Sequence, residues 1–431
     1  MEVNLAPHKT CVVVFRRPRT PLPSGFRLRY RGCEVALQKQ YVYLGVLMHE
    51  TRGLAGAADA LAAAGSKAMH AVLTRCRRAN LTQFDIKTRM FDVLVEPVLS
   101  YASHIWGPLS FRKRLLASPF STKSEGVHTS YLRIMAGASK SASLDVVYRD
   151  LHRLPIMYHW VVLAVRWWTK MSKARQDEQP MACRAWVEDV KLAKAGCATC
   201  WSSHLLHTLC SLHLLDGGWR QQPLDWLLGR SWEEGVVQQT LDALFKARWQ
   251  GPFPDDPRVA PSRGIAMCQH AVWVYPVDPS VDFYTRATAP THTRLCLPFT
   301  QLRNLAQLRI GCAHLEVEQG RKRRPKVPRP DRLCKLCSGE DAPLARRLAA
   351  FSRTGTSKNV EDLKHFLVEC PVYDDLRAAC PGFPVDVYST LSDPDCVASV
   401  IGHDAQAALA NTLYRMKVRR AELLGLPVGM I

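Results

Sequence analysis

The sequence predicts a mainly α-helical protein with a small β piece at its N-terminus, an α+β chain. Short β-branched runs separated by proline and glycine occupy residues 1–50, and apolar residues recur at helical spacing from Leu54 onward. Hydrophobic residues make up 47% of the 431 residues and charged residues 22%, which is typical of folded domains. A chain of this length has room for several domains, each with its own core.

Three segments near the N-terminus have the composition of β-strands. They are the β-branched run at 11–15, the alternation of apolar and basic residues at 26–30, and the run at 41–45. The residues that favour turns between the first two are Pro18, Pro21, Pro23 and Gly25.

Helical periodicity follows through most of the chain. Apolar residues three or four apart predict a helix over 57–76 and a second over 86–105, which Pro97 should kink. Further helical patterns lie at 127–137, 144–153, 156–173, 181–250, 298–311 and 405–424. The proline-rich stretch 251–290 is typical of a linker. The tryptophans lie within helical patterns beside Leu and Val, so we expect most of them in cores and not stacked on bases.

The charge balance favours a polyanionic partner. The chain has 58 Lys+Arg against 38 Asp+Glu, a formal net charge of +20, which suits nucleic acid or an acidic membrane surface. No apolar run is long enough to span a bilayer and the N-terminus has no secretory signal, so we expect an intracellular protein of the nucleus or cytoplasm without membrane partners. In a reducing compartment its 15 cysteines would serve metals or cores. Protein partners are left open.

Four residues have the spacing of a structural zinc site. Cys334 and Cys337 are two residues apart in a knuckle, and His365 and Cys370 add an imidazole and a third thiolate. Three sulfurs and one nitrogen make the closed tetrahedral shell that is typical of structural zinc. We therefore predict one structural Zn²⁺, with a short helix over 343–351 inside the long gap between its ligands. The alternative is two loop cysteines and an unrelated pair in the core.

A second group of Cys and His residues competes for the metal. Its members are Cys197, Cys200, His204, His207, Cys210 and His213. Several of them would share one helical face, so a metal site is geometrically possible. Leucines are interleaved among them as a packing stripe, which favours the edge of a core over a second metal site.

A run of basic residues, the basic strap (residues 321–332), precedes the zinc ligands. It has seven basic residues and one acid, Asp331, and three prolines that should keep the backbone extended. Such an array suits a phosphate backbone, although a nuclear localisation signal or a solvated loop would have the same composition. The residues expected to contact nucleic acid are Arg321, Lys322, Arg323, Arg324, Lys326 and Arg329.

Short motifs in a fixed order resemble the C-terminal part of a non-LTR retrotransposon (LINE-type) reverse transcriptase over nearly the whole chain. The matching stretches are residues 3–15, 41–45, 94–101, 105–107, 154–156, 167–168, 308–311, 315–321, 361–367 and 370–373. Their order, ending in the zinc spacing, is more specific than any single piece. The resemblance implies four segments: the end of the palm with the primer grip at 1–50, a helical thumb and extension at 51–180, a helical linker region with a Pro-rich connector at 181–297, and the basic strap, zinc-knuckle domain and C-terminal helix at 298–431.

The parent activity implied by this resemblance is RNA-directed DNA polymerase in target-primed reverse transcription. Polymerases of this family hold two Mg²⁺ ions with palm aspartates, on strands that precede the last palm motif. Only Met1 and Glu2 precede that motif here, so we expect a truncated copy of a transposable element without catalytic residues, inactive alone, with Mg²⁺ belonging to an intact parent. Residues 373–375, Tyr-Asp-Asp, look like the missing catalytic hairpin, but their surroundings predict the start of a helix.

The resemblance also implies contacts to nucleic acid near the N-terminus. Tyr43 and Gly45 match the primer grip, and Lys9 matches a palm lysine thought to steady the leaving pyrophosphate. The residues on or beside the thumb-like helix that would touch the template–primer duplex are Lys67, Arg75, Arg77 and Arg78. We thus expect a fragment that binds RNA or RNA–DNA duplex. The alternative is a zinc-dependent protein-interaction module of a host-recruited or inert element remnant.

Overall fold

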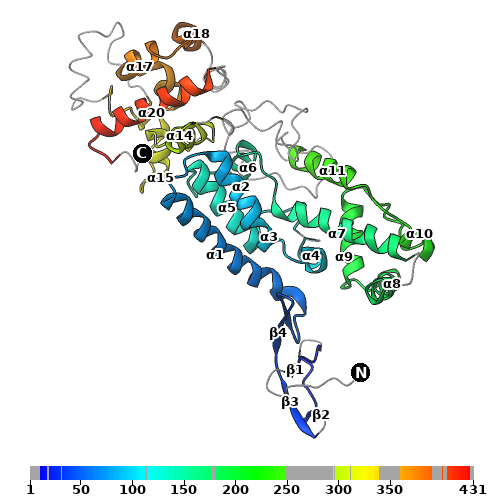
Figure 1. Ribbon diagram of the computed structural model, residues 1–431. Helices are drawn as coiled ribbons and strands as arrows, with labels where there is room; N and C mark the ends of the chain where they lie inside the picture. Colours follow the sequence, from blue (N-terminus) through cyan, green and yellow to red (C-terminus); the bar gives the residue numbers. More distant parts are fainter. Residues whose placement is uncertain are drawn as a thin grey trace. The chain divides into compact units, whose positions relative to one another are not determined.

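A computed structural model describes most of the chain. The described residues are 10–16, 19–30, 32–111, 114–140, 142–175, 180–247, 295, 297–310, 312–338, 360–390, 400 and 405–427. Over these residues the chain is mainly helical, and its strands lie between residues 11 and 49, which confirms the predicted fold class (Figure 1). Unit 1 comprises Met1–Thr74, Met90–His128 and Pro155–Leu241, and unit 2 comprises Arg75–Arg89, Thr129–Leu154 and Asp242–Ile431. The four segments implied by the resemblance stay a prediction.

The strands of unit 1 form two small sheets. They are β1 (Cys11–Val12), β2 (Leu28–Tyr30), β3 (Cys33–Leu37), β4 (Gln40–Tyr43) and β5 (Val46–His49). β3 pairs in parallel with β1 and antiparallel with β2, whereas β4 and β5 form a hairpin. The strands predicted at 11–15, 26–30 and 41–45 are confirmed with shorter bounds. β3 and β5 were not predicted, because neither has a long β-branched run.

The turn between β4 and β5 requires a glycine. Leu44 and Gly45 have φ angles of 46° and 81°, the left-handed conformations of a tight hairpin turn. The Tyr101 hydroxyl donates a hydrogen bond of 2.8 Å to the Leu44 carbonyl oxygen. A Cβ atom at Gly45 would lie 3.1 Å from the Tyr101 ring, so glycine serves both the turn and the close approach of this ring.

From residue 57 to residue 247, every element that the structure describes is a helix. They are α1 (Ala57–Arg78), α2 (Phe84–Leu94), α3 (Glu96–Leu99), α4 (Ser103–Phe111), α5 (Lys123–Ala136), α6 (Leu144–Asp150), α7 (Ile156–Ala174), α8 (Met181–Lys194), α9 (Trp201–Ser211), α10 (Leu224–Leu228) and α11 (Glu234–Ala247). The predicted single helix over 86–105 is wrong. Pro97 lies in the first turn of the separate helix α3, where its missing N–H is tolerated, and Ala102 with φ 51° separates α3 from α4.

Tryptophans form much of the core of unit 1. Trp160 and Trp168 lie on the buried helix α7. Trp160 packs edge-on against Trp106 with 4.6 Å between ring centroids, and Trp168 packs in the same way against Trp186 with 4.9 Å between ring centroids. These four and Trp219 are almost completely buried, which confirms the core prediction for them. Trp249, Trp273 and the predicted linker at 251–290 lie outside the described residues.

Unit 2 contains a separate apolar core around the predicted zinc ligands. Its C-terminal helices are α14 (Phe299–Arg309), α15 (Glu316–Lys322), α17 (Asp374–Ala378), α18 (Val385–Thr390) and α20 (Gln406–Leu423). Leucines of α14 and α20 pack with Phe366, Tyr373 and Cys370 in one buried cluster. The helices predicted at 298–311 and 405–424 are confirmed, and the one predicted at 343–351 lies outside the described residues. Among the described helices, none has the length and apolar character needed to cross a membrane.

Candidate metal centre

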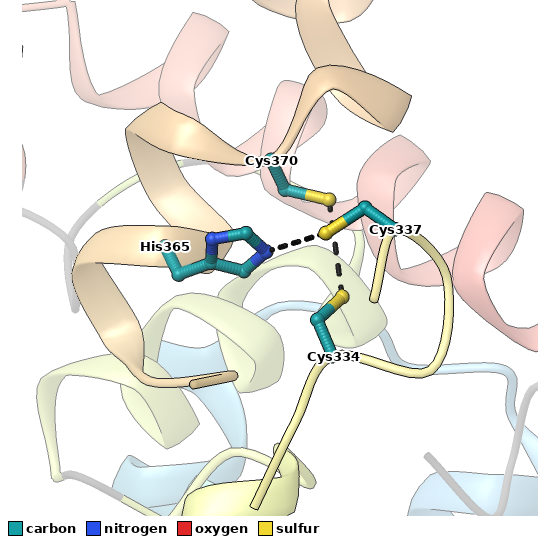
Figure 2. A group of neighbouring side chains, drawn as sticks. All are labelled: Cys334, Cys337, His365 and Cys370. Carbon is teal, nitrogen blue, oxygen red and sulfur yellow. Dashed lines mark hydrogen bonds between the residues drawn. The ribbon is translucent and has the colours of Figure 1, made fainter. Parts of the chain in front are cut away.

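Three thiols and one imidazole converge at one point of unit 2. The ligand atoms of Cys334, Cys337, His365 and Cys370 all lie within 4.8 Å of one another (Figure 2). The Sγ atoms of Cys334 and Cys370 are 4.0 Å apart, and Cys337 Sγ lies 3.2 Å from His365 Nε2. A tetrahedral shell with metal–sulfur bonds of about 2.3 Å separates its sulfurs by about 3.8 Å. The donor set and its spacing therefore fit one metal ion, as predicted.

The first two ligands are held by a turn that is anchored to the strand-like segment before His365. Ser338 N donates a hydrogen bond of 2.9 Å to the Cys334 carbonyl oxygen, which closes the knuckle turn. Leu333 and Val360 form an antiparallel bridge, so the two halves of the site approach each other although 27 residues separate Cys337 from His365. Backbone pairing next to the site therefore brings the two pairs of ligands together despite the long segment between them.

A π-helical turn presents the other two ligands. Residues His365–Glu369 are wound with the wider turn of a π-helix, and Cys370 N donates to the His365 carbonyl oxygen at 2.7 Å. In an α-helix, residues five positions apart point about 140° away from each other. The wider turn brings His365 and Cys370 to one side, as Figure 2 shows, in keeping with the use of such turns at functional sites.

The imidazole is oriented for metal binding. Its Nε2 atom faces the sulfurs, and Glu369 Oε2 lies 3.8 Å from its Nδ1 atom, an ion-pair distance longer than a hydrogen bond. The interaction with His365 lowers the pKa of Glu369. A carboxylate beside the nitrogen that faces away from the metal commonly fixes the orientation of a metal-bound histidine.

Hydrogen bonds inside the cluster shift the pKa values of its thiols and of its imidazole. Contacts with Cys334 and then Cys370 hold the pKa of the Cys337 thiol far below its ordinary value, and the contact with Cys334 raises the pKa of Cys370. Burial acts to lower the pKa of His365, but hydrogen bonds to Cys334 and Cys337 outweigh it and raise this pKa to about 11. The favoured state without metal is thus thiolate beside imidazolium, and a metal ion would displace protons from the site.

A buried ion pair joins the site to the C-terminal helix. Glu361 and Arg420 are 1% and 3% exposed, and Arg420 donates from Nε and a terminal nitrogen to the two carboxylate oxygens at 2.9 and 2.7 Å. Glu361 also accepts a hydrogen bond of 2.7 Å from Glu316 N and lies 3.8 Å from Cys334 Sγ. Sequence reasoning did not give Arg420 a role, because an arginine in a basic helix has no pattern that marks it as buried.

The Tyr-Asp-Asp motif is the start of a helix, as predicted. Asp374 and Asp375 are the first two residues of α17 and pair with Arg377 and Arg419. Arg377 is itself buried and donates to the carbonyl oxygens of Leu367 and Cys370 at 3.4 and 2.5 Å. The two aspartates are thus engaged in ion pairs, and Asp374 holds the arginine whose hydrogen bonds support the π-helical turn.

The second Cys/His group does not converge. Cys200 precedes α9 and donates to the Cys197 carbonyl oxygen at 3.5 Å, and Cys210 donates to the Asp216 carbonyl oxygen at 3.5 Å. His207 Nε2 is 3.1 Å from an Arg220 terminal nitrogen. Within the part of the chain that the structure describes, the C-terminal cluster alone has metal-binding geometry.

The cations predicted to contact nucleic acid differ in their surroundings. On α1, the side chains of Lys67, Arg75, Arg77 and Arg78 are exposed. Tyr43 on β4 is 56% exposed, and Gly45 has the structural role in the turn described above. Lys9 lies outside the described residues.

The basic strap is only partly extended, which corrects the expectation for residues 321–332. Residues 321 and 322 end helix α15, the backbone bends at residues 323–325, and Arg329–Asp331 forms a 3₁₀ turn. Arg323 pairs with Glu316 at 2.7 Å and Arg329 with Asp362 at 3.5 Å.

Among the strap side chains that the structure describes, those of Arg324 and Lys326 are left for a partner. Arg332 donates to the carbonyl oxygens of Val327 and Val317, which folds the strap back on itself. The exposed side chains of Arg324 and Lys326 have no hydrogen-bond or ion-pair partner among the described residues.

No protein-family model, curated protein or solved structure matches this chain. The family resemblance therefore stays a prediction that rests on the motifs of the sequence. The metal-binding geometry stands independently of it, because it follows from the positions of four side chains in the structure.

Proposed function

We propose that this chain binds RNA or an RNA–DNA duplex, and that one structural zinc ion holds the strap-bearing part of unit 2 in its binding conformation. The observation that carries the proposal is the convergence of Cys334, Cys337, His365 and Cys370 directly after the free cations of the basic strap. The resemblance to the C-terminal part of a LINE-type reverse transcriptase supports the same function. A nuclear or cytoplasmic location accords with it.

Zinc is the metal that this ligand set favours. Three thiolates and one imidazole are soft to borderline donors that suit Zn²⁺, and four protein ligands leave no position open for a substrate. Cys334 and Cys370 are buried, and all four side chains lie around the apolar core of unit 2. The ion would thus supply folding energy to this core and no catalysis.

Nucleic acid is the partner that the free charges favour. Arg324 and Lys326 are exposed without acidic neighbours, and the last turn of α1 presents Arg75, Arg77 and Arg78. A cation already paired to a carboxylate must break that pair to bind phosphate, whereas an unpaired one binds at once. Phosphate contacts of this kind give strong, salt-dependent binding with little sequence preference.

The chain is proposed to bind nucleic acid without copying it. The parent reaction needs metal-binding aspartates, and the one Tyr-Asp-Asp motif of the sequence begins helix α17 with both aspartates in ion pairs. RNA-directed DNA polymerase activity and Mg²⁺ therefore belong to the parent enzyme of the resemblance.

The salt dependence of RNA binding tests the proposal. Replacing Arg324 and Lys326 by alanine should lower the slope of log affinity against log salt by about 1.4 on single-stranded RNA, because each lost phosphate contact accounts for about 0.7. The control is Lys173→Ala with Arg184→Ala, which removes the same charge from exposed positions of unit 1. Equal slopes for the wild type and the strap variant would reject the strap as a nucleic-acid contact and favour the protein-interaction module.

A further inference from the structure

A pocket in unit 2 lies between α14, α20 and the π-helical turn. Its empty space is about 350 Å³ when the open solvent at its mouth is included, and its walls include Asn304, Gln307, Leu308, Phe366, Leu413 and Lys417. The wall also includes Arg420, which is paired with Glu361, but it includes none of the four metal ligands and no residue of the basic strap. The walls are mainly apolar, so a charged group inside is only partly screened by water.

A lysine without a carboxylate partner lies in this pocket. Lys417 Nζ donates to Asn304 Oδ1 at 2.7 Å and to Gln307 Oε1 at 3.0 Å. An ammonium has three N–H donors, so one remains without a protein acceptor among the described residues. Burial lowers the pKa of Lys417 to about 8, with the Arg303 guanidinium adding to the effect. An anion in the pocket would supply the missing opposite charge.

A residue of the pocket wall, Asn304, has a second donor that is unused. Because Asn304 Oδ1 must face the ammonium, which cannot accept a hydrogen bond, the other amide atom is Nδ2. Asn304 is 6% exposed, and its Nδ2 atom is buried without a hydrogen-bond partner in the described structure. Gln307 is satisfied on both sides, since its Nε2 donates to the Gly137 carbonyl oxygen at 2.8 Å. A buried donor left unpaired carries a desolvation cost that a ligand oxygen would relieve.

We infer that this pocket binds a terminal phosphate group, that of a phosphate monoester or of inorganic phosphate, through the free N–H of Lys417 and the Nδ2 atom of Asn304. Both groups only donate, so they select a ligand whose oxygens accept, and the positive charge selects an anion. A terminal phosphate can enter a one-sided pocket, whereas the chain of an internal phosphodiester must leave it on both sides. The source is the 5′-phosphate of an RNA end, which rests on the proposed function, or free phosphate.

Titration of the full chain with inorganic phosphate tests the pocket independently of RNA. Calorimetry at constant ionic strength should show saturable binding by the wild type, weakened at least about tenfold in Lys417→Met and in Asn304→Asp. Asn304→Asp keeps the shape of the side chain and pairs Lys417 internally, so it tests the site even if Lys417→Met fails to fold. The control, Arg415→Met, removes an exposed charge two residues away on the same helix and should bind like the wild type.

RNA that ends in a 5′-phosphate or a 5′-hydroxyl then identifies the source. Tighter binding of the 5′-phosphate form by the wild type, lost in Asn304→Asp, would assign the pocket to RNA ends. Phosphate binding without discrimination between the two RNAs would assign it to free phosphate. Absence of phosphate binding by the wild type, or equal binding by Asn304→Asp, would overturn the inference even if RNA binding itself were confirmed.

Discussion

Replacing Arg420 with methionine should destabilise unit 2 far more than its position in a basic helix suggests. The change leaves the Glu361 carboxylate, 1% exposed, with Glu316 N as its remaining close donor and with Cys334 Sγ 3.8 Å away. Removing one partner of a buried ion pair costs about 3–5 kcal/mol, because the remaining charge is buried and uncompensated. The uncompensated carboxylate would also repel the Cys334 thiolate, so zinc affinity should fall by roughly 10–100-fold.

The adjacent arginine gives a matched control. Arg419 pairs with Asp375, but the two side chains are 31% and 65% exposed, so Arg419→Met should cost less than about 1 kcal/mol. Native-state hydrogen exchange of unit 2 amides measures both free energies, and competition with a chromogenic chelator measures zinc affinity. The double change Glu361→Gln with Arg420→Met should recover part of the loss, since it removes both charges. If Arg420→Met costs no more than Arg419→Met, the reasoning about the buried pair is wrong.

Three further predictions concern the turn, the metal and catalysis. Gly45→Ala should destabilise the β4–β5 hairpin by about 1–2 kcal/mol, because alanine disfavours the left-handed backbone, and faster proteolytic cleavage of the hairpin would report it. Mass spectrometry under native conditions should find one zinc ion in the purified chain. Cys334→Ser should lose this ion and Cys200→Ser should keep it. Two tightly held ions would contradict the assignment. The chain should not extend a primer with Mg²⁺ or Mn²⁺, because Asp374 and Asp375 are paired at a helix start, and nucleotide incorporation by a clean preparation would refute this.

Periodic features of the fold could be predicted from the sequence. The apolar spacing along α1, α7, α14 and α20 identified these helices within a few residues. Two failures have physical causes. The pattern at 86–105 continues across Pro97, but proline is tolerated in the first turn of a new helix and destabilises the interior of a continuous one. Helix α15 contains a glycine and acidic residues and has no apolar periodicity, so its continuation into the first two residues of the strap was not predicted.

The metal site could be predicted from ligand types and spacing, whereas its support could not. A Cys-x-x-Cys pair has the spacing of two ligands of one metal ion, so the first two ligands are recognisable locally. The π-helical turn at His365–Glu369 and the pair of Glu361 with Arg420 depend on tertiary packing, which no local pattern encodes. Likewise, Asn304 and Lys417 lie more than 100 residues apart in sequence, and only the fold brings them together.

RNA binding before and after removal of zinc tests the central claim most directly. Fluorescence anisotropy of labelled single-stranded RNA would be recorded across salt concentrations for the zinc-loaded, chelator-treated and reloaded chain, with Cys334→Ser as the variant that cannot be reloaded. If zinc holds the strap in its binding conformation, chelation should lower the salt slope by about 1.4, the value of two phosphate contacts, and reloading should restore it in the wild type alone. Equal affinity and equal slope with and without zinc would contradict the account.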